Sequence, residues 1–306
     1  MRRHPVVWFL SWSLAAMPLA GCERRAVASA RAAAPPVSTA EAKPTADIAD
    51  DDMDALMRAA FPGWRHGDPR VLHVPQRDDA NASTTIRIEP KMVVKVDDAH
   101  RALVTIGEVS DENGNDRGAH SDQGTAGVYL FERRAGRWVK TRAQDAVAWA
   151  GSDGVLSAIE TANLGPGRPA LFVEGSYTGQ GETTVWAQVV EVGPTGARVV
   201  LPDLELHEDT YGATNGDCES WARGTRTPSR AELENESGSP CHEITGKWHV
   251  EPAVGAARGD LAVVYTVHRV VDDPQTKARS FETVTETVVY RDAPTGYARL
   301  SGNEPR

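Results

Sequence analysis

The 306-residue sequence has few cysteines, no apolar run long enough to cross a membrane as a helix, and no cluster of basic residues. The apolar run at residues 6–16 is too short, because a membrane-spanning helix needs about 20 apolar residues. The 43 acidic side chains outnumber the 33 basic ones, which gives a formal net charge of −10. Nucleic acids and anionic surfaces are bound through clusters of Lys and Arg. We therefore expect no nucleic-acid partner.

Compact catalytic motifs are also missing from the sequence. There is no Gly-x-Ser-x-Gly, no Ser-x-x-Lys and no His-Glu-x-x-His, and we predict no catalytic residue. A glycan-directed hydrolase stays open as an alternative, because it needs only two carboxylates that the fold brings together. His207, Glu208 and Asp209 are consecutive, and with Glu174 or Glu182 they offer such a pair.

The first residues have the features of an export signal, with Arg2 and Arg3 ahead of the apolar run and small residues ahead of a cysteine. Leu19-Ala20-Gly21-Cys22 resembles the lipobox of bacterial lipoproteins at every position. The resemblance implies that residues 1–21 are a lipoprotein signal peptide and that Cys22 is the site of lipid attachment. An ordinary secretory signal followed by an unrelated cysteine is the alternative.

The lipobox resemblance also implies a location and a membrane partner. A cysteine of this class carries two or three acyl chains such as palmitate, and two chains hold a protein stably because each buried methylene contributes about 0.8 kcal/mol. Glu23 follows Cys22 in place of the Asp that usually marks retention in the inner membrane. We therefore expect a lipoprotein of the bacterial cell envelope, anchored in the outer membrane and facing the periplasm.

Composition divides the rest of the chain into a tether and one domain. Residues 22–50 are rich in Ala, Pro, Ser and Thr, which predicts a flexible tether. Asp50–Asp52 provide an N-cap, and apolar residues follow at helical spacing up to Pro62-Gly63, which predicts a helix over residues 51–62. Such a short helix needs a partner. We expect it to pack as a lid on a single β-rich domain over residues 51–306.

From about residue 70 the pattern changes to short apolar strands separated by turns, and a hairpin is predicted with its turn at Glu89-Pro90-Lys91. After it, a unit of two strands, a Gly turn and a third short strand recurs three times. The first strands begin at Ala102, Ala170 and Leu261, and the turns contain Gly136, Gly196 and Gly296. The alternative to a repeat is the ordinary spacing of turns in an antiparallel protein. Either way, the predicted fold is mainly β, an antiparallel meander arranged as a sandwich or a partial propeller.

Two cysteines remain once Cys22 is assigned to the lipid. In an exported protein we expect Cys218 and Cys241 to form one disulfide. A metal site is the less favoured alternative, because no Cys-x-x-Cys spacing is present. The extra length between the second and third units includes both cysteines, so residues from about 205 to 250 are predicted to form an insertion closed by the disulfide.

The glycine-rich segment at residues 174–182 is the predicted binding edge. It joins two predicted strands, and glycines let a backbone approach a ligand or another chain closely. Tyr177 and Gln180 would supply polar contacts, and we count Glu174 and His207 as further candidate binding residues. A plain hairpin turn is the alternative.

A second polar loop has the side-chain pattern of a calcium site. Asp111, Asn113 and Asn115 place oxygen atoms at alternate positions, and Asp122 stands at the twelfth position of the loop. The sixth position is Asp116 where a calcium loop requires Gly, and a long hairpin loop uses the same residue types. Apart from this possible calcium ion, no cofactor is expected.

The helix end at residues 60–63, the glycine-rich loop and the late cysteine pair resemble uncharacterised exported proteins of proteobacteria. That resemblance implies no activity. The sequence predicts a lipid-anchored envelope protein whose β domain binds a protein or glycan without catalysis. The alternatives are an envelope hydrolase that uses Asp, Glu and His, and a purely structural spacer.

Overall fold

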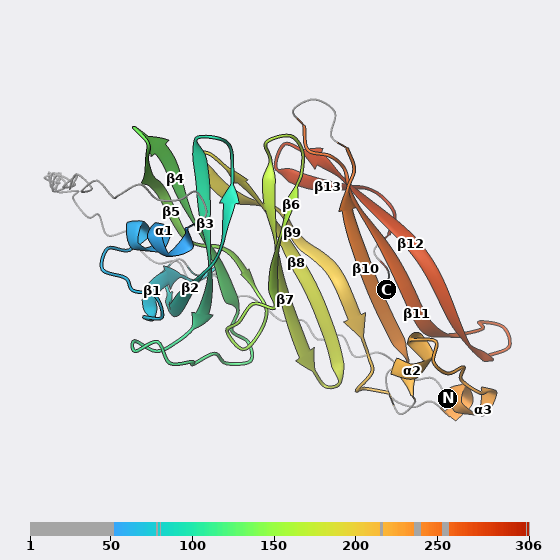
Figure 1. Ribbon diagram of the computed structural model, residues 1–306. Coiled ribbons are helices and arrows are strands. Elements are labelled where there is room, and N and C mark those ends of the chain that lie inside the picture. The colour runs from blue at the N-terminus through green and yellow to red at the C-terminus, as the bar shows by residue number, and fades with distance from the viewer. Residues whose placement is uncertain are drawn as a thin grey trace, which may run out of the picture. The chain divides into compact units, whose positions relative to one another are not determined.

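The computed structural model describes residues 52–77, 79, 81–214, 217–235, 240–252, 257–303 and 305. Within these residues the chain forms thirteen strands and three short helices, and neighbouring strands of each sheet are antiparallel (Figure 1). The predicted fold class, mainly β with an antiparallel meander, is confirmed. The predictions for the signal peptide, for Cys22 and for the tether up to residue 50 concern a part of the chain outside the described residues.

The first sheet is a five-stranded meander in which each strand pairs with the next one along the chain. Its strands are β1 (Arg70–Pro75), β2 (Ser83–Lys95), β3 (His100–Val109), β4 (Gly124–Arg134) and β5 (Arg137–Ala150). The two edge strands β1 and β5 also contact each other, so the sheet is curled. The helix α1 (Met53–Ala60) packs against β2, β3 and β5.

The helix α1 packs as the predicted lid. The Asp52 carboxylate accepts a hydrogen bond from the Ala55 backbone N–H (2.8 Å), which caps the first turn. Leu56 and Met57 are fully buried, and the Phe61 ring meets the Tyr129 ring edge to face, with centroids 5.0 Å apart. The apolar stripe of the helix therefore covers one face of the first sheet and forms a single apolar cluster with it.

The second sheet has eight strands, again in sequence order. They are β6 (Ala158–Asn163), β7 (Pro169–Gly179), β8 (Glu182–Gly193), β9 (Gly196–Asp209), β10 (His242–Val250), β11 (Leu261–Asp272), β12 (Arg279–Ala293) and β13 (Gly296–Ser301). β9 and β10 are joined by only three residue pairs, whereas β11 and β12 pair along twelve. Two four-stranded meanders are thus fused at a short seam.

The strands of the three predicted units lie where the apolar runs place them. The first strands of the units are in β3, β7 and β11, the second strands in β4, β8 and β12, and the third strands in β5, β9 and β13. One further strand precedes each unit, namely β2, β6 and β10. The chain is therefore organised as successive four-stranded meanders, preceded by β1 and α1.

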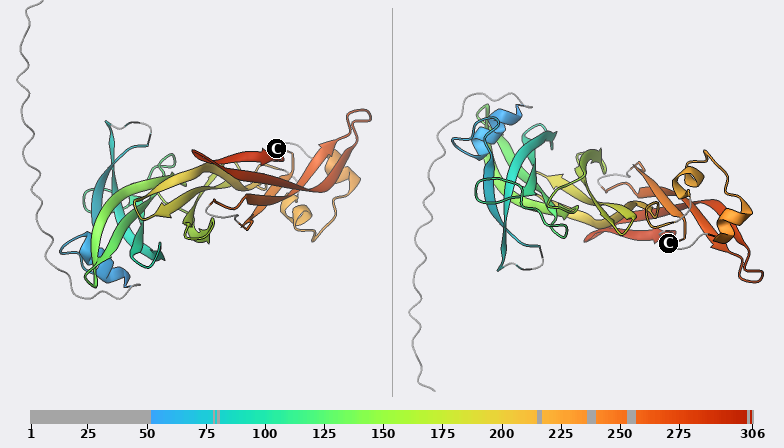
Figure 2. Two further views of the ribbon diagram at one scale, coloured as in Figure 1. Left: turned by 90° about the horizontal axis from the view of Figure 1, so that it is seen from above. Right: turned by 90° about the horizontal axis from the view of Figure 1, so that it is seen from below.

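The second sheet coils so strongly that strands separated by two others touch. The rings of Phe172 in β7 and Trp248 in β10 are stacked, with centroids 3.8 Å apart and planes at 5°. At the same end, the Gly259 N–H donates to the Leu164 carbonyl (2.6 Å). Figure 2 shows the coiled strands from above and below. One face of this sheet therefore packs largely on itself.

The opposite face of the second sheet packs on the first sheet. The buried side chains of this cluster come from β2 to β5, with Val96 just after β2, and from β6 to β9. They include Ala102, Val104, Val128, Leu130, Leu171, Val173, Val190 and Val192. Because burial of apolar surface contributes about 25 cal/mol per Å², this shared cluster is the main stabilising contact between the two sheets.

The predicted hairpin at Glu89-Pro90-Lys91 is wrong, because residues 83–95 form the single strand β2. Pro90 pairs with Thr105, Met92 pairs with Val104, and the register shifts between them. Lys91 is therefore the extra residue of a β-bulge. Proline has no N–H for the ladder, and a bulge accommodates it without turning the chain back.

The predicted disulfide is confirmed: Cys218 and Cys241 are bonded. The segment outside the sheet is shorter than predicted, since β9 continues to Asp209 and β10 begins at His242. The helices α2 (Cys218–Ala222) and α3 (Arg230–Asn235) belong to this excursion. The two cysteines form a small apolar cluster with Trp221 and Leu233, and Phe281 of β12 packs against it.

Reduction of this disulfide should lower the free energy of unfolding by roughly 3 kcal/mol. The bond joins residues separated by 23 positions, and opening a loop of about that length releases the corresponding chain entropy to the unfolded state. Urea denaturation with and without reductant measures the change, with the C218A/C241A double variant as the control that reductant should not affect. An unchanged midpoint together with two titratable thiols in the native protein would contradict the assignment.

Candidate functional site

Three loop segments from the two sheets meet at one edge of the domain, and we call this surface the junction face. It consists of residues 118–122 of the β3–β4 loop, residues 151–157 between β5 and β6, and residues 175–181 around the β7–β8 turn (Figure 1). The third segment carries the predicted binding residues Tyr177 and Gln180.

Close backbone approach holds the junction face together. A Cβ atom on Gly175 would lie 1.9 Å from the Gly151 backbone nitrogen, so only glycine fits there. The Ser157 N–H donates to the Glu174 carbonyl (2.9 Å). The hydroxyls of Ser157 and Ser176 are 2.8 Å apart. The glycines of this segment thus let segments of this chain pack closely, whereas the sequence suggested the approach of a ligand or of another chain.

Tyr177 is the most prominent side chain of the junction face. It lies in β7 with 42% of its surface exposed. Its ring lies against the His120 ring, with centroids 4.8 Å apart. His120 is in turn within 3.1 Å of the Asp153 carboxylate, and Val155 of the same segment is 40% exposed. An exposed aromatic ring held by a neighbouring ring is suited to contact a partner.

The predicted loop at residues 174–182 is in fact a two-residue turn. β7 extends to Gly179, β8 begins at Glu182, and both intervening residues have positive φ, 54° at Gln180 and 85° at Gly181. Two such residues are typical of a type I′ hairpin turn, whose twist matches that of the flanking strands. The alternative of a plain hairpin turn therefore describes residues 180 and 181, while Tyr177 belongs to a strand.

Glu174 and His207 are the predicted binding residues outside the junction face. Glu174 is half-buried, and burial together with the nearby charge of Glu160 raises the pKa of its carboxyl. His207 lies within β9, where its Nε2 is 2.9 Å from the Asp209 carboxylate. Since β8 lies between β7 and β9, His207 is not part of the junction face. The structure therefore keeps Tyr177 and Gln180 on the junction face, with Glu174 next to it in β7, and places His207 elsewhere.

A hollow of about 340 Å³ lies next to the disulfide, and it bears on the hydrolase alternative. Glu182, Glu208, His242 and Arg269 line it, whereas Glu174 does not. His242 Nδ1 is 3.7 Å from the Glu208 carboxylate. Burial lowers the pKa of His242, although the negative charge of Glu208 acts in the opposite direction. Glu182 and Glu208, one of the carboxylate pairs that the sequence offered, thus share a cavity.

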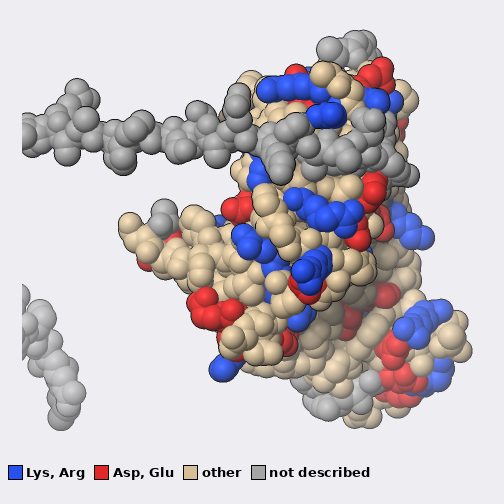
Figure 3. Space-filling model, turned by 60° about the vertical axis from the view of Figure 1, so that its left-hand side comes forward, with Lys and Arg blue, Asp and Glu red and all other residues tan. Residues whose placement is uncertain are grey.

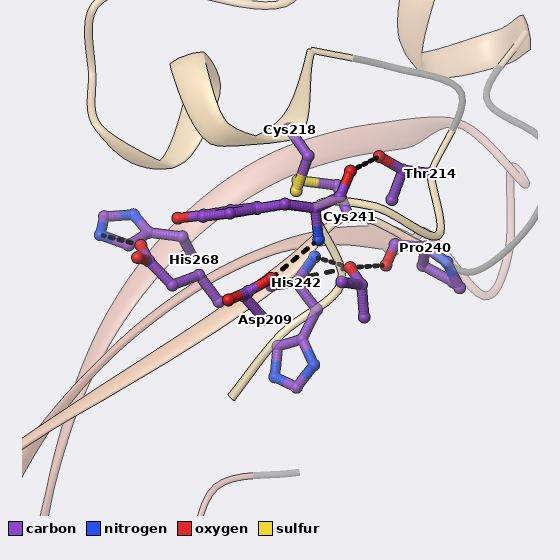
Figure 4. Close-up of a disulfide and its surroundings, with 10 residues drawn as sticks. Asp209, Thr214, Cys218, Pro240, Cys241, His242 and His268 are labelled. Atoms are coloured by element: carbon purple, nitrogen blue, oxygen red, sulfur yellow. Dashed lines mark hydrogen bonds and ion pairs between the residues drawn. A yellow bond between two sulfur atoms is a disulfide. The ribbon is translucent and has the colours of Figure 1, made fainter. Parts of the chain in front are cut away.

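Asp209 of the His207–Asp209 cluster and the following Thr210 have structural partners near the disulfide, and Figure 4 shows the surroundings. The Asp209 carboxylate accepts a hydrogen bond from the Tyr211 N–H (3.0 Å) and so fixes the chain where it leaves β9. The Thr210 hydroxyl donates to the Pro240 carbonyl (2.9 Å), which ties the start of the excursion to its end. These contacts explain why polar side chains gather at this point of the sequence.

In the predicted calcium loop, carboxylate oxygen atoms accept hydrogen bonds from backbone N–H groups of the loop itself. The Asp111 carboxylate accepts hydrogen bonds from the Asn113 N–H (2.8 Å) and the Asn115 N–H (2.9 Å), and Asp122 accepts one from the Ala119 N–H (2.8 Å). Hydrogen bonds from Asn115 hold the pKa of Asp111 below its usual value. Among the described residues, no three His, Cys, Asp or Glu side chains are grouped as metal ligands. A calcium ion stays a prediction without support from the geometry.

One charged cluster was not found from the sequence. Glu191 of β8 has a side chain that is 10% exposed, and it accepts hydrogen bonds from Arg168 (2.5 Å), Arg198 (3.1 Å) and Arg258 (2.7 Å). Arg258 also contacts the Asp292 carboxylate. In the sequence, the cluster is indicated only by one charged residue, Glu191, inside the largely apolar run Ala187–Val192. The arginines that bind Glu191 are 7 to 67 residues away along the chain. Only the fold identifies them.

The surface carries charges of both signs side by side. On the face shown in Figure 3, Lys and Arg alternate with Asp and Glu over the described residues. No helix in the described part of the chain has the length and apolar character needed to cross a membrane.

Comparison of the chain with protein-family models, with curated proteins and with solved structures finds no match.

Proposed function

We propose that the chain is a lipid-anchored protein of the bacterial cell envelope, held in the outer membrane through Cys22 and facing the periplasm. Its β domain binds a protein or glycan partner through the junction face and does not catalyse a reaction. The Leu19-Ala20-Gly21-Cys22 motif supports the anchor. The Cys218–Cys241 disulfide supports an oxidising compartment such as the periplasm, because disulfides are rare in the cytosol.

The exposed Tyr177 ring is the observation on which the binding proposal depends. The side chain projects from a strand, which is a rigid support, and His120 restricts its position. A ring that is already ordered loses little conformational entropy when a partner covers it. Tyr is also one of the residue types that dominate binding energies at protein interfaces, and its ring stacks equally well on a sugar face.

Replacing Tyr177 by Ala should abolish partner capture while the fold persists. Loss of an exposed aromatic anchor costs about 2 kcal/mol or more of binding energy, which is at least about a 30-fold loss of affinity. The measurement is chemical crosslinking of the tagged protein in cells, followed by identification of captured proteins and glycans. Leu300→Ala is the control, because Leu300 is a similarly exposed apolar residue of β13. Equal capture by Y177A, L300A and the wild type would contradict the proposal.

The hydrolase alternative has one supporting observation, the shared cavity of Glu182 and Glu208. Glu208→Gln separates the two functions, since it removes a carboxylate needed for glycoside hydrolysis and leaves Tyr177 untouched. Binding without catalysis predicts that E208Q captures the same partner as the wild type. Cleavage of isolated cell-wall glycans by the wild type, and its loss in E208Q, would favour the hydrolase.

A further inference from the structure

The Glu191 cluster contains more positive than negative charge. Three guanidinium groups, those of Arg168, Arg198 and Arg258, surround one carboxylate, and Asp292 adds a second carboxylate beside Arg258. The described residues of the cluster thus carry three cations and two anions. The nearby Arg291 does not alter this balance, because it is paired with Asp260 (2.7 Å).

The most buried member of the cluster has an unused donor. The Arg258 side chain is 3% exposed, and its Nη1 and Nη2 atoms bind Asp292 and Glu191. Its Nε–H is buried and has no hydrogen-bond partner among the described residues. A buried donor without a partner costs about 1–3 kcal/mol, and an acceptor supplied by a ligand would recover that energy.

Two adjoining hollows give access to the arginines. One, of about 510 Å³, is lined by Arg168, Glu191 and Arg198 together with the β8–β9 turn. The other, of about 380 Å³, is lined by Arg168, Arg198 and Arg258. Arg168 and Arg198 stand between the two hollows and belong to both. A small anion in either hollow would meet at least two guanidinium groups.

Exposure distinguishes this cluster from a closed structural ion pair. The Arg198 side chain is 52% exposed although its Nη2 binds the almost fully buried Glu191 carboxylate. Arg198 uses Nε and Nη2 for that bond, at 3.3 Å and 3.1 Å, so the other edge of its guanidinium is directed away from Glu191. A guanidinium with one edge fixed by a carboxylate is pre-oriented to bind an oxyanion with the other.

We propose that Arg168, Arg198 and Arg258 form a binding site for an anionic group, a carboxylate or a phosphate ester of a ligand. Glu191 is the positioning residue, which fixes all three guanidinium groups from the buried side. The site is separate from the junction face and does not depend on the function proposed for Tyr177. A single oxyanion would balance the charge of the cluster.

The test is titration of the full chain, purified in detergent, with inorganic phosphate and with acetate at constant ionic strength, with chloride as the reference anion. The arginine Nε–H signals are followed by NMR, because the buried Arg258 Nε–H reports directly on the site. Arg198→Gln removes one cation at an exposed position. Arg134→Gln is the matched control, because Arg134 binds Glu132 through the same two atoms, Nε (2.9 Å) and Nη2 (2.7 Å), at the β4–β5 hairpin.

We expect a saturable shift of the Arg258 signal with phosphate, acetate or both, unchanged in R134Q and about tenfold weaker in affinity in R198Q. The tighter of the two probes identifies the ligand group as a phosphate or a carboxylate. Shifts that never saturate, or equal affinity in R198Q and the wild type, would overturn the proposal. Because Tyr177 is untouched, this result is independent of partner capture.

Discussion

Replacing Cys22 by Ser should move the protein from the membrane fraction to the soluble periplasm. Without a thiol no acyl chain can be attached, and the only anchor that the proposal invokes is lost. Two acyl chains hold a protein at a bilayer because each buried methylene contributes about 0.8 kcal/mol, whereas the remaining chain is acidic and has no cluster of basic residues to bind anionic lipid. Fractionation of cells that express either form measures the change.

Incorporation of an alkyne-modified palmitate is the second readout of the same experiment. It separates loss of the lipid from retention of an uncleaved signal, which would keep the variant on the membrane by another route. The C218A/C241A double variant serves as the control, because it removes two cysteines outside the lipobox and should keep both the label and the membrane location. Labelled palmitate on C22S would contradict the anchor.

Replacing Glu191 by Gln should destabilise the fold by about 3 kcal/mol, because it leaves the guanidinium of Arg258 buried with Asp292 as its only described anionic partner. Glu132→Gln is the matched control. Glu132 binds Arg134 with similar geometry, but its side chain is 33% exposed, and exposed pairs contribute about 0–1 kcal/mol. Urea denaturation at neutral pH measures both. Equal effects of E191Q and E132Q would contradict the buried role of Glu191.

The effect of E191Q should also depend on pH. Burial opposes ionisation of Glu191, but hydrogen bonds from Arg258 and Arg168 outweigh it, and the pKa lies below the ordinary value of 4.5. A carboxyl with a lowered pKa in the folded state stabilises that state above the unfolded pKa, and the contribution is lost as the pH falls through the folded pKa. The stability difference between the wild type and E191Q should therefore be largest near pH 7 and shrink below about pH 4.5.

Local patterns in the sequence were sufficient for some elements of the fold. Short apolar runs located β3, β7 and β11, and the spacing of Leu56, Met57 and Ala60 located the helix α1. The cysteine pair was assigned because only two thiols remained. The strands and the helix were inferred from residues close in sequence. The disulfide was inferred because neither cysteine had another cysteine to pair with.

Prediction from the sequence was wrong or incomplete where pairing between residues far apart in the chain determines the structure. Pro90 suggested a turn, but pairing of β2 with β1 and β3 keeps the chain extended and turns the proline into part of a bulge. The three pairs between β9 and β10 that fuse two meanders have no local signal. The same holds for the cluster around Glu191, because Arg258 is 67 residues away.

The candidate site was predicted in part. Tyr177 was singled out for the glycines around it, and it is exposed on the junction face. Its neighbours His120 and Asp153 were not predicted, because they come from loops 24 to 57 residues earlier that only sheet packing brings to β7.

The central claim is that the anchored protein binds a partner through the junction face, and photo-crosslinking in intact cells tests it most directly. A photoreactive phenylalanine analogue, which keeps an aromatic ring at the anchor position, is placed at position 177 in one form and at position 300 in another, since both native side chains are exposed. The proposal predicts one discrete adduct from position 177, absent from position 300 and lost when Cys22 is replaced by Ser. The same adducts from both positions, or none from position 177, would contradict it.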